Sequence, residues 1–127
     1  MRIRRHFTVE GHSPYEAIAF KTAASEIRNP DGSIVFAQGD IEIPESWSQV
    51  ASDVLAQKYF RKAGVPKTLK PVPEEGVPEF LWKKQAGGKD TTGEKSAKQV
   101  FDRLAGTWTY WGWKGGYFDG ETDAQAF

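Results

Sequence analysis

A four-residue turn, Asn29-Pro30-Asp31-Gly32, is the feature that most constrains how this chain can fold. Pro30 fixes its own φ for the first corner of a β-turn, and Gly32 tolerates a positive φ that other residues avoid. Residues 17–28 before the turn and residues 33–36 after it are rich in the apolar side chains that favour strands. The pattern predicts an antiparallel hairpin.

The segment that follows extends this prediction. Ile41, Glu42 and Ile43 alternate apolar and polar side chains, which predicts a third short strand ending before Pro44. The sheet is therefore expected to be small and antiparallel, with its hairpin near residues 17–43.

A first helix is predicted from about residue 46 to residue 63. Ser46 can cap its start, and Gln49 lies three residues further on, as in a capping box. Gly64 and Pro66 then supply a left-handed stop and a helix breaker. One apolar stripe at steps of three and four residues is expected: Trp47, Val50, Ala51, Val54, Leu55 and Tyr59.

A second helix is predicted from about residue 93 to residue 111. Its apolar face recurs at the same steps and comprises Ala97, Val100, Phe101, Leu104, Trp108 and Trp111. Between the helices, residues 65–93 hold four prolines and then three glycines, which predicts an extended and mobile connector. An apolar knot of Val77, Phe80, Leu81 and Trp82 would attach it to the core. The fold class that follows is α+β.

The aromatic run from Trp108 to Phe118 is the most unusual local feature, and it has two interpretations. Its tryptophans could stack bases or sugars while Lys114 contacts a phosphate. Packing against another surface is favoured, because the helical phase continues unbroken through Trp111. The predicted interface residues are Trp108, Trp111, Trp113, Tyr117 and Phe118.

The remaining chemistry is sparse. The chain has no cysteine, which excludes disulfides, thiolate metal sites and cysteine nucleophiles within it. His6 and His12 are six residues apart, which matches no known metal pattern. Asp119, Glu121 and Asp123 lack the glycine and the distal glutamate of a calcium loop. We therefore predict no catalytic, cofactor-binding or metal-binding residue.

Charge and hydropathy limit the kinds of partner and the cellular location that the chain can have. Seventeen basic residues balance 17 acidic ones, so the overall charge does not favour nucleic acid or an anionic membrane. Arg2, Arg4 and Arg5 resemble the start of a leader, but the polar residues after them do not continue one. No apolar run approaches the roughly 20 residues that a membrane helix needs. We expect a cytoplasmic protein without a membrane partner.

The end of the chain suggests a longer protein. Asp119 can cap a helix whose first turn carries Glu121 and Asp123, yet only about two turns are present before Phe127. So short a helix is unstable alone. The chain is therefore expected to be a truncated piece of a longer polypeptide.

Several blocks together resemble the amino-terminal region of bacterial class II ribonucleotide reductases. They are IAF at 18–20, SEIRNPDG at 25–32, PESWSQVA at 44–51, LAQKYFRKAGVP at 55–66 and TWTYWGWKGGYF at 107–118. Each block alone is a weak signal, but their order along nearly the whole chain is specific. Residues 67–95 resemble the family only loosely.

The resemblance implies an enzyme of DNA precursor synthesis, a ribonucleoside-diphosphate reductase with adenosylcobalamin and a thioredoxin-type reductant. In that family an α/β barrel follows the amino-terminal region, and its cysteines carry the radical chemistry. Residues 1–127 would then be a single amino-terminal domain that precedes the barrel. Its partner would be the barrel, in the same chain or as a split chain, and this segment would hold no cofactor or catalytic residue.

Two alternatives remain open. The chain could be a free-standing module that binds nucleotides or single strands through its aromatic side chains. It could also be a regulatory or structural subunit of a split enzyme.

Overall fold

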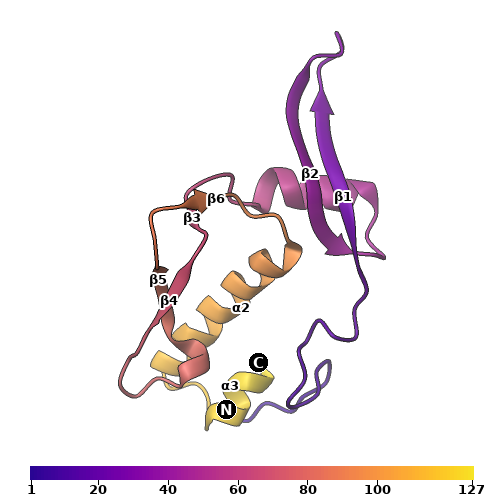
Figure 1. Cartoon of the computed structure of the whole chain (residues 1–127). Helices are drawn as coiled ribbons and strands as arrows, with labels where there is room; N and C mark the ends of the chain where they lie inside the picture. The colour runs from indigo at the N-terminus through magenta and orange to yellow at the C-terminus, as the bar shows by residue number, and fades with distance from the viewer. The chain divides into compact units, whose positions relative to one another are not determined.

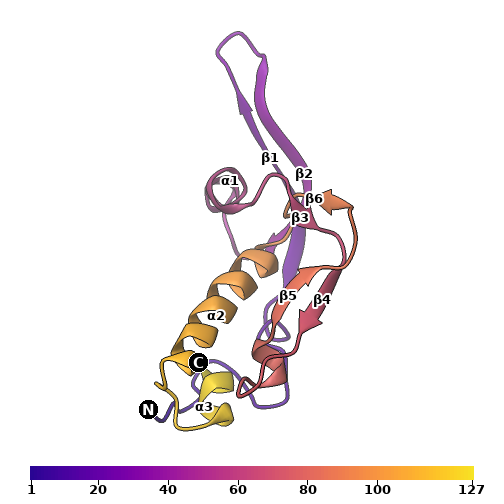
Figure 2. The ribbon, with the colours of Figure 1, turned by 90° about the vertical axis from the view of Figure 1, so that its left-hand side faces the viewer.

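The computed structural model describes residues 1–127, which form two compact units. The hairpin unit comprises residues 17–65 and 91–101, and the aromatic unit comprises residues 1–16, 66–90 and 102–127. Small two-stranded sheets and helices make up both units (Figures 1 and 2), so the predicted α+β class is confirmed. No helix is both long enough and apolar enough to cross a lipid bilayer.

The predicted hairpin is confirmed as an antiparallel pair, β1 (Phe20–Arg28) and β2 (Ile34–Pro44). At its turn, the Gly32 amide donates to the Asn29 carbonyl at 2.9 Å, and the Asn29 amide donates to the Ser33 carbonyl at 2.8 Å. Gly32 has a φ of 89°. The turn therefore uses its proline and glycine as the sequence predicts.

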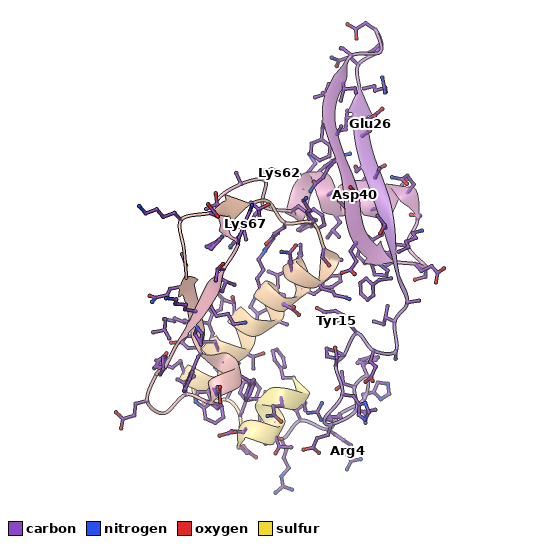
Figure 3. All side chains as sticks on the ribbon, in the orientation of Figure 1. Arg4, Tyr15, Glu26, Asp40, Lys62 and Lys67 are labelled. Atoms are coloured by element: carbon purple, nitrogen blue, oxygen red, sulfur yellow. The ribbon has the colours of Figure 1, made fainter.

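The prediction of a separate third strand was wrong. Ile41 and Ile43 lie in β2 itself and pair with Ala23 and Lys21 of β1. Between Ile41 and Gln38 the register shifts, and Asp40, labelled in Figure 3, has a φ of 53°. The extra residue is a β-bulge, which bends a strand without ending it.

The first helix forms with different ends. α1 (Gln49–Val54) continues as the π-helical turn η1 (Leu55–Tyr59), so the helix spans 49–59 instead of 46–63. Ser48, rather than Ser46, is the N-cap, because its Oγ accepts from the Ala51 amide at 3.2 Å. At the other end, Phe60 is already extended.

The predicted apolar stripe of this helix was only partly right, because Leu55 is buried as predicted but three other members are not. Ser52, Leu55 and Ala56 are the buried residues, whereas Val50, Val54 and Tyr59 are exposed. The buried contacts towards the hairpin are partly polar: the Ser25 Oγ donates to the Asp53 Oδ1 at 2.7 Å. The helix face that packs on the hairpin is therefore mixed, with polar Ser52 and Asp53 beside apolar Leu55 and Ala56.

The free edge of β2 is partly covered by the segment before the second helix. The Glu42 amide donates to the Lys95 carbonyl at 2.7 Å. Glu94 is buried, and its carboxylate accepts from the Arg61 amide at 2.9 Å. The core of the hairpin unit lies beside these contacts, and its most buried apolar residues include Ile41, Ile43, Leu55, Ala56, Phe60, Ala97 and Val100.

The predicted connector contains more regular structure than expected. β4 (Leu69–Val72) and β5 (Lys83–Ala86) form a second antiparallel pair, and the short 3-10 helix η2 (Glu79–Leu81) lies between them. β3 (Val65–Pro66) pairs with β6 (Thr91–Thr92). Prolines are tolerated here because a two-stranded pair leaves edge positions that need no N–H donor. In the predicted apolar knot, Val77 and Leu81 are buried while Phe80 is exposed.

The second helix, α2 (Ala97–Lys114), lies three to four residues later than predicted. A capping box sets its start: the Ser96 Oγ accepts from the Lys98 amide at 3.2 Å, and the Gln99 Oε1 accepts from the Ser96 amide at 3.0 Å. Ser96 and Gln99 are therefore the local signal for this start, and the periodicity alone does not find it. A short third helix, α3 (Glu121–Ala126), ends the chain.

Candidate functional site

The end of α2 determines how the predicted interface residues are arranged. The Tyr117 amide donates to the Gly112 carbonyl at 2.9 Å, and the Gly116 amide donates to the Trp113 carbonyl at 3.0 Å. Gly116 has a φ of 71°, so the helix ends in a Schellman motif. This motif turns the chain back towards the helix, which brings Tyr117 and Phe118 beside its last turn.

Phe118 packs inside the aromatic unit. Its ring lies against the Cα of Gly112, where a Cβ would meet ring atoms at 2.7 and 2.9 Å. The same ring lies 5.6 Å, centroid to centroid, from the ring of Phe127 beyond α3. Phe118 therefore joins α2 to α3 and is half-buried.

Trp113 also turns inward. Its indole Nε1 donates to the Gly76 carbonyl at 2.7 Å, and Gly76 lies in the loop between β4 and η2. Of the five predicted interface residues, Trp113 and Phe118 thus have partners within the aromatic unit.

The other three are exposed and define what we call the aromatic surface. Trp108 is 54% exposed, Trp111 is 63% exposed and Tyr117 is 66% exposed. Trp108 and Trp111 lie one helical turn apart on the same side of α2. The Tyr117 ring covers Gly115, whose amide donates to the Trp111 carbonyl at 2.9 Å. Large aromatic side chains exposed together are typical of a docking surface.

A charged cluster stabilises the helix next to this surface. Glu74 accepts from the Lys114 Nζ at 2.6 Å and from the Tyr110 hydroxyl at 2.8 Å. The hydrogen bond from Lys114, and then that from Tyr110, hold the pKa of Glu74 below its ordinary value. The bond to Glu74 likewise raises the pKa of Lys114. Lys114, which the stacking hypothesis assigned to a phosphate, is therefore paired with a carboxylate.

The amino-terminal segment is attached to the same unit (Figures 1 and 2). The amino group of Met1 pairs with the Asp119 carboxylate, and the Ile3 amide donates to the Asp123 Oδ1 at 2.8 Å. Asp119 was predicted as the cap of α3, but Gly120 holds that position. Two of the three predicted helix-start acids thus bind the chain start, which no local sequence pattern indicates.

Tyr15, labelled in Figure 3, adds another attachment. Its hydroxyl donates to the Asp102 Oδ1 at 2.6 Å, at the beginning of the part of α2 that belongs to the aromatic unit. Burial, and then the hydrogen bond to Asp102, raise the pKa of the Tyr15 phenol. The phenol is consequently a structural donor at neutral pH.

The chain offers no group of three or more histidine, cysteine, aspartate or glutamate side chains arranged to hold a metal ion. The His12 Nδ1 lies 2.8 Å from the Glu16 Oε2, and the His6 ring lies edge-on against Phe7. What this surface offers a partner is its exposed aromatic side chains.

Comparison with known proteins identifies the family. The family model described as class II vitamin B12-dependent ribonucleotide reductase matches residues 21–127. A protein named vitamin B12-dependent ribonucleotide reductase from Bradyrhizobium diazoefficiens is 61% identical over 136 residues, and one of the same name from Agrobacterium fabrum is 59% identical over 136 residues. Another from Rhodopirellula baltica is 30% identical over 118 residues, which cover 93% of this chain.

The chain belongs to the family of class II vitamin B12-dependent ribonucleotide reductases and corresponds to its amino-terminal region. The first two relatives match all of this chain, but the chain spans only 11% of the length of each. Against the Rhodopirellula baltica relative the share is 9%.

Proposed function

We propose that this chain is the amino-terminal scaffold region of an adenosylcobalamin-dependent ribonucleotide reductase, the enzyme that makes deoxyribonucleotides for DNA synthesis. The observation that carries the proposal is an exposed aromatic surface in a chain that spans 11% of the relatives it matches. Such a surface gains stability when a partner covers it. The remainder of the same enzyme, its catalytic α/β barrel, is the partner, in the same chain or as a split chain.

The segment itself takes no part in the chemistry. The chain contains no cysteine, so the thiols of the radical reaction belong to the remainder of the enzyme. Cobalamin does not fit the residues present either. The structure has two open surface hollows. One is lined by residues 17–19, Glu45 and Ser46, and the other by a mixed set that includes Phe80 and Lys84. Both hollows are open to solvent, so neither encloses a bound cofactor and excludes water from it.

The finer parts of the proposal follow from the family. Residues 1–127 act as one amino-terminal domain, and the whole enzyme is a ribonucleoside-diphosphate reductase that uses a thioredoxin-type reductant. Its location is the cytoplasm, where such an enzyme supplies DNA synthesis. Trp108, Trp111 and Tyr117 form the contact with the barrel, while Trp113 and Phe118 support that contact from within.

A chimera tests the proposal. This chain replaces the matching region of the Bradyrhizobium diazoefficiens relative, to which it is 61% identical. The chimera is expected to reduce ribonucleoside diphosphates when supplied with adenosylcobalamin and reduced thioredoxin, and the isolated chain is expected to show no turnover. A folded chimera without activity, beside an active parent enzyme, would contradict the proposal.

A second candidate, nucleotide stacking, rests on the exposed pair Trp108 and Trp111. Its weakness is Lys114, which is bound to Glu74 instead of being available to a phosphate. Tryptophan fluorescence of the isolated chain, titrated with nucleotides and with single-stranded oligonucleotides, separates the two candidates. Scaffold function predicts a flat response at millimolar ligand, whereas saturable quenching would support stacking.

A further inference from the structure

The far end of the β1–β2 hairpin carries apolar side chains that the hairpin unit leaves uncovered. Ile27 is 38% exposed, Ile34 is 53% exposed and Val35 is 60% exposed. These residues flank the turn, and they lie beyond the part of the hairpin that α1 contacts. Both views of the ribbon show the hairpin continuing past α1 (Figures 1 and 2). We call Ile27, Ile34 and Val35 the hairpin end.

The two halves of the hairpin differ in how far their apolar side chains are buried. In the half near Pro44, Ile41 and Ile43 are fully buried. In the half near the turn, Phe36 is covered only in part, and the Lys62 ammonium lies 4.4 Å from the centre of its ring. A two-stranded hairpin without a third strand or a covering helix is at best marginally stable in water. The hairpin end therefore has both apolar area and a need for cover.

The charges at the turn satisfy one another. Arg28 pairs with the Glu26 carboxylate and donates from Nη1 to the Gly32 carbonyl at 3.0 Å. The Asp31 carboxylate accepts from the Ser33 hydroxyl at 2.6 Å and from the Ser33 amide at 2.9 Å. Because these charged groups pair within the turn, the side chains at the hairpin end that lack a contact are the apolar Ile27, Ile34 and Val35.

We propose that the hairpin end inserts into an apolar groove on the remainder of the same reductase. This inference rests on the proposed function, because it needs the chain to be part of a larger enzyme. The length of the relatives identifies the partner. This chain spans 11% of the Bradyrhizobium diazoefficiens and Agrobacterium fabrum relatives, so about nine-tenths of each relative lies outside it. The contact is independent of the aromatic surface, because it belongs to the other unit.

Single-cysteine labelling tests the insertion. The chain has no cysteine of its own, so one introduced thiol can be followed by mass spectrometry of its peptide. The variants are Ile34→Cys at the hairpin end, Ala24→Cys as an exposed control on the same hairpin, and Thr107→Cys beside the aromatic surface. Maleimide labelling rates are compared between the isolated chain and the chimera described above. Hydrogen exchange of residues 26–37 in the unsubstituted proteins provides a measurement that needs no variant.

The inference predicts that position 34 labels at least tenfold more slowly in the chimera than in the isolated chain, while position 24 labels alike in both. Amides of residues 26–37 are expected to exchange more slowly in the chimera. Equal, fast labelling at position 34 would overturn the inference, as would equal protection at positions 24 and 34. Protection that appears in the isolated chain and rises with its concentration would assign the surface to a second copy instead.

Position 107 keeps the two proposals distinguishable. Protection there without protection at position 34 leaves the proposed function standing and ends the hairpin inference. Protection at position 34 without protection at position 107 supports the hairpin contact and removes the aromatic surface from the barrel interface.

Discussion

The ring of Phe118 lies against Gly112, so closely that a Cβ at that position would meet the ring at 2.7 Å. Gly112 is a poor helix former in the interior of α2, and its presence is explained by this contact. Gly106 lies in the same helix, but a Cβ there meets nothing within 4 Å outside the helix's own backbone. The two glycines therefore form a matched pair for mutation.

Replacing these glycines should give opposite results. Gly106→Ala is expected to raise the free energy of unfolding by about 0.5–1 kcal/mol, because alanine favours a helix. Gly112→Ala is expected to lower it by about 1 kcal/mol, because displacing Phe118 costs more than the helix gains. Urea unfolding monitored by circular dichroism measures both. If Gly112→Ala stabilised the chain as much as Gly106→Ala, the contact with Phe118 would not exist as described.

Acid should weaken the cluster around Glu74. The carboxylate pKa is lowered by Lys114 and Tyr110, so its stabilising effect is complete above the ordinary value of 4.5 and is lost as pH falls through the lowered pKa. Lys114 shows the reverse sign: its pKa is raised, so its contribution is lost only as pH rises through a value above the ordinary 10.5.

Thermal midpoints of the original chain and of Glu74→Gln between pH 7 and pH 3 test this linkage. The substitution should flatten the decline in midpoint below pH 4.5. Glu75, the neighbouring exposed carboxylate, provides the control variant Glu75→Gln. If the thermal midpoint of Glu74→Gln fell with acid as much as that of the original chain, other carboxylates would account for the decline.

Asp40 adopts a left-handed backbone with a φ of 53° in the bulge of β2. Side chains with a Cβ are strained in this region, whereas glycine is not. Asp40→Gly is expected to raise the free energy of unfolding by up to about 1 kcal/mol, and Asp40→Val to lower it by about 1–2 kcal/mol. Chemical unfolding of both variants checks the order. Equal stability of the glycine and valine variants would argue against a left-handed residue here.

Ser25 is buried and donates to Asp53, which makes this pair sensitive to truncation. Asp53→Ala should cost about 1–3 kcal/mol, because it leaves the Ser25 hydroxyl without that acceptor. The double variant Ser25→Ala with Asp53→Ala should recover part of the loss. A double-mutant cycle by urea unfolding measures the coupling, and additive effects would deny it.

Local chemistry decided which features the sequence could predict. The turn at Pro30 and Gly32 was predictable because its residues need only one another. The first helix was placed too early, because Ser46 and Ser48 both suit an N-cap and only Ser48 accepts from a helical amide. The apolar periodicity wrongly predicted Val50 and Val54 as buried, because spacing alone cannot distinguish a helix face that packs internally from one that is exposed to solvent.

The sequence predicted the aromatic residues of the candidate site together, but not which of them are exposed and which pack inside the unit. The pattern identified Trp113 and Trp111 together, yet Trp113 finds its acceptor at Gly76, 37 residues away. Glu74 has no local signal either, because its partners Tyr110 and Lys114 reach it only through the tertiary fold. The family blocks, by contrast, are recognisable in the amino-acid sequence alone, because they depend on residue identity and order, and the match over residues 21–127 agrees with them.

The central claim is that the aromatic surface of this chain is covered by the remainder of a ribonucleotide reductase. The most direct measurement is the effect of Trp111→Ala on the free energy of unfolding, from urea titrations, of the isolated chain and of the chimera. Trp111 is 63% exposed, so the isolated chain should change by no more than about 0.5 kcal/mol. In the chimera the loss should reach about 2 kcal/mol, as for a buried tryptophan at an interface. Equal small effects in both proteins would contradict the account.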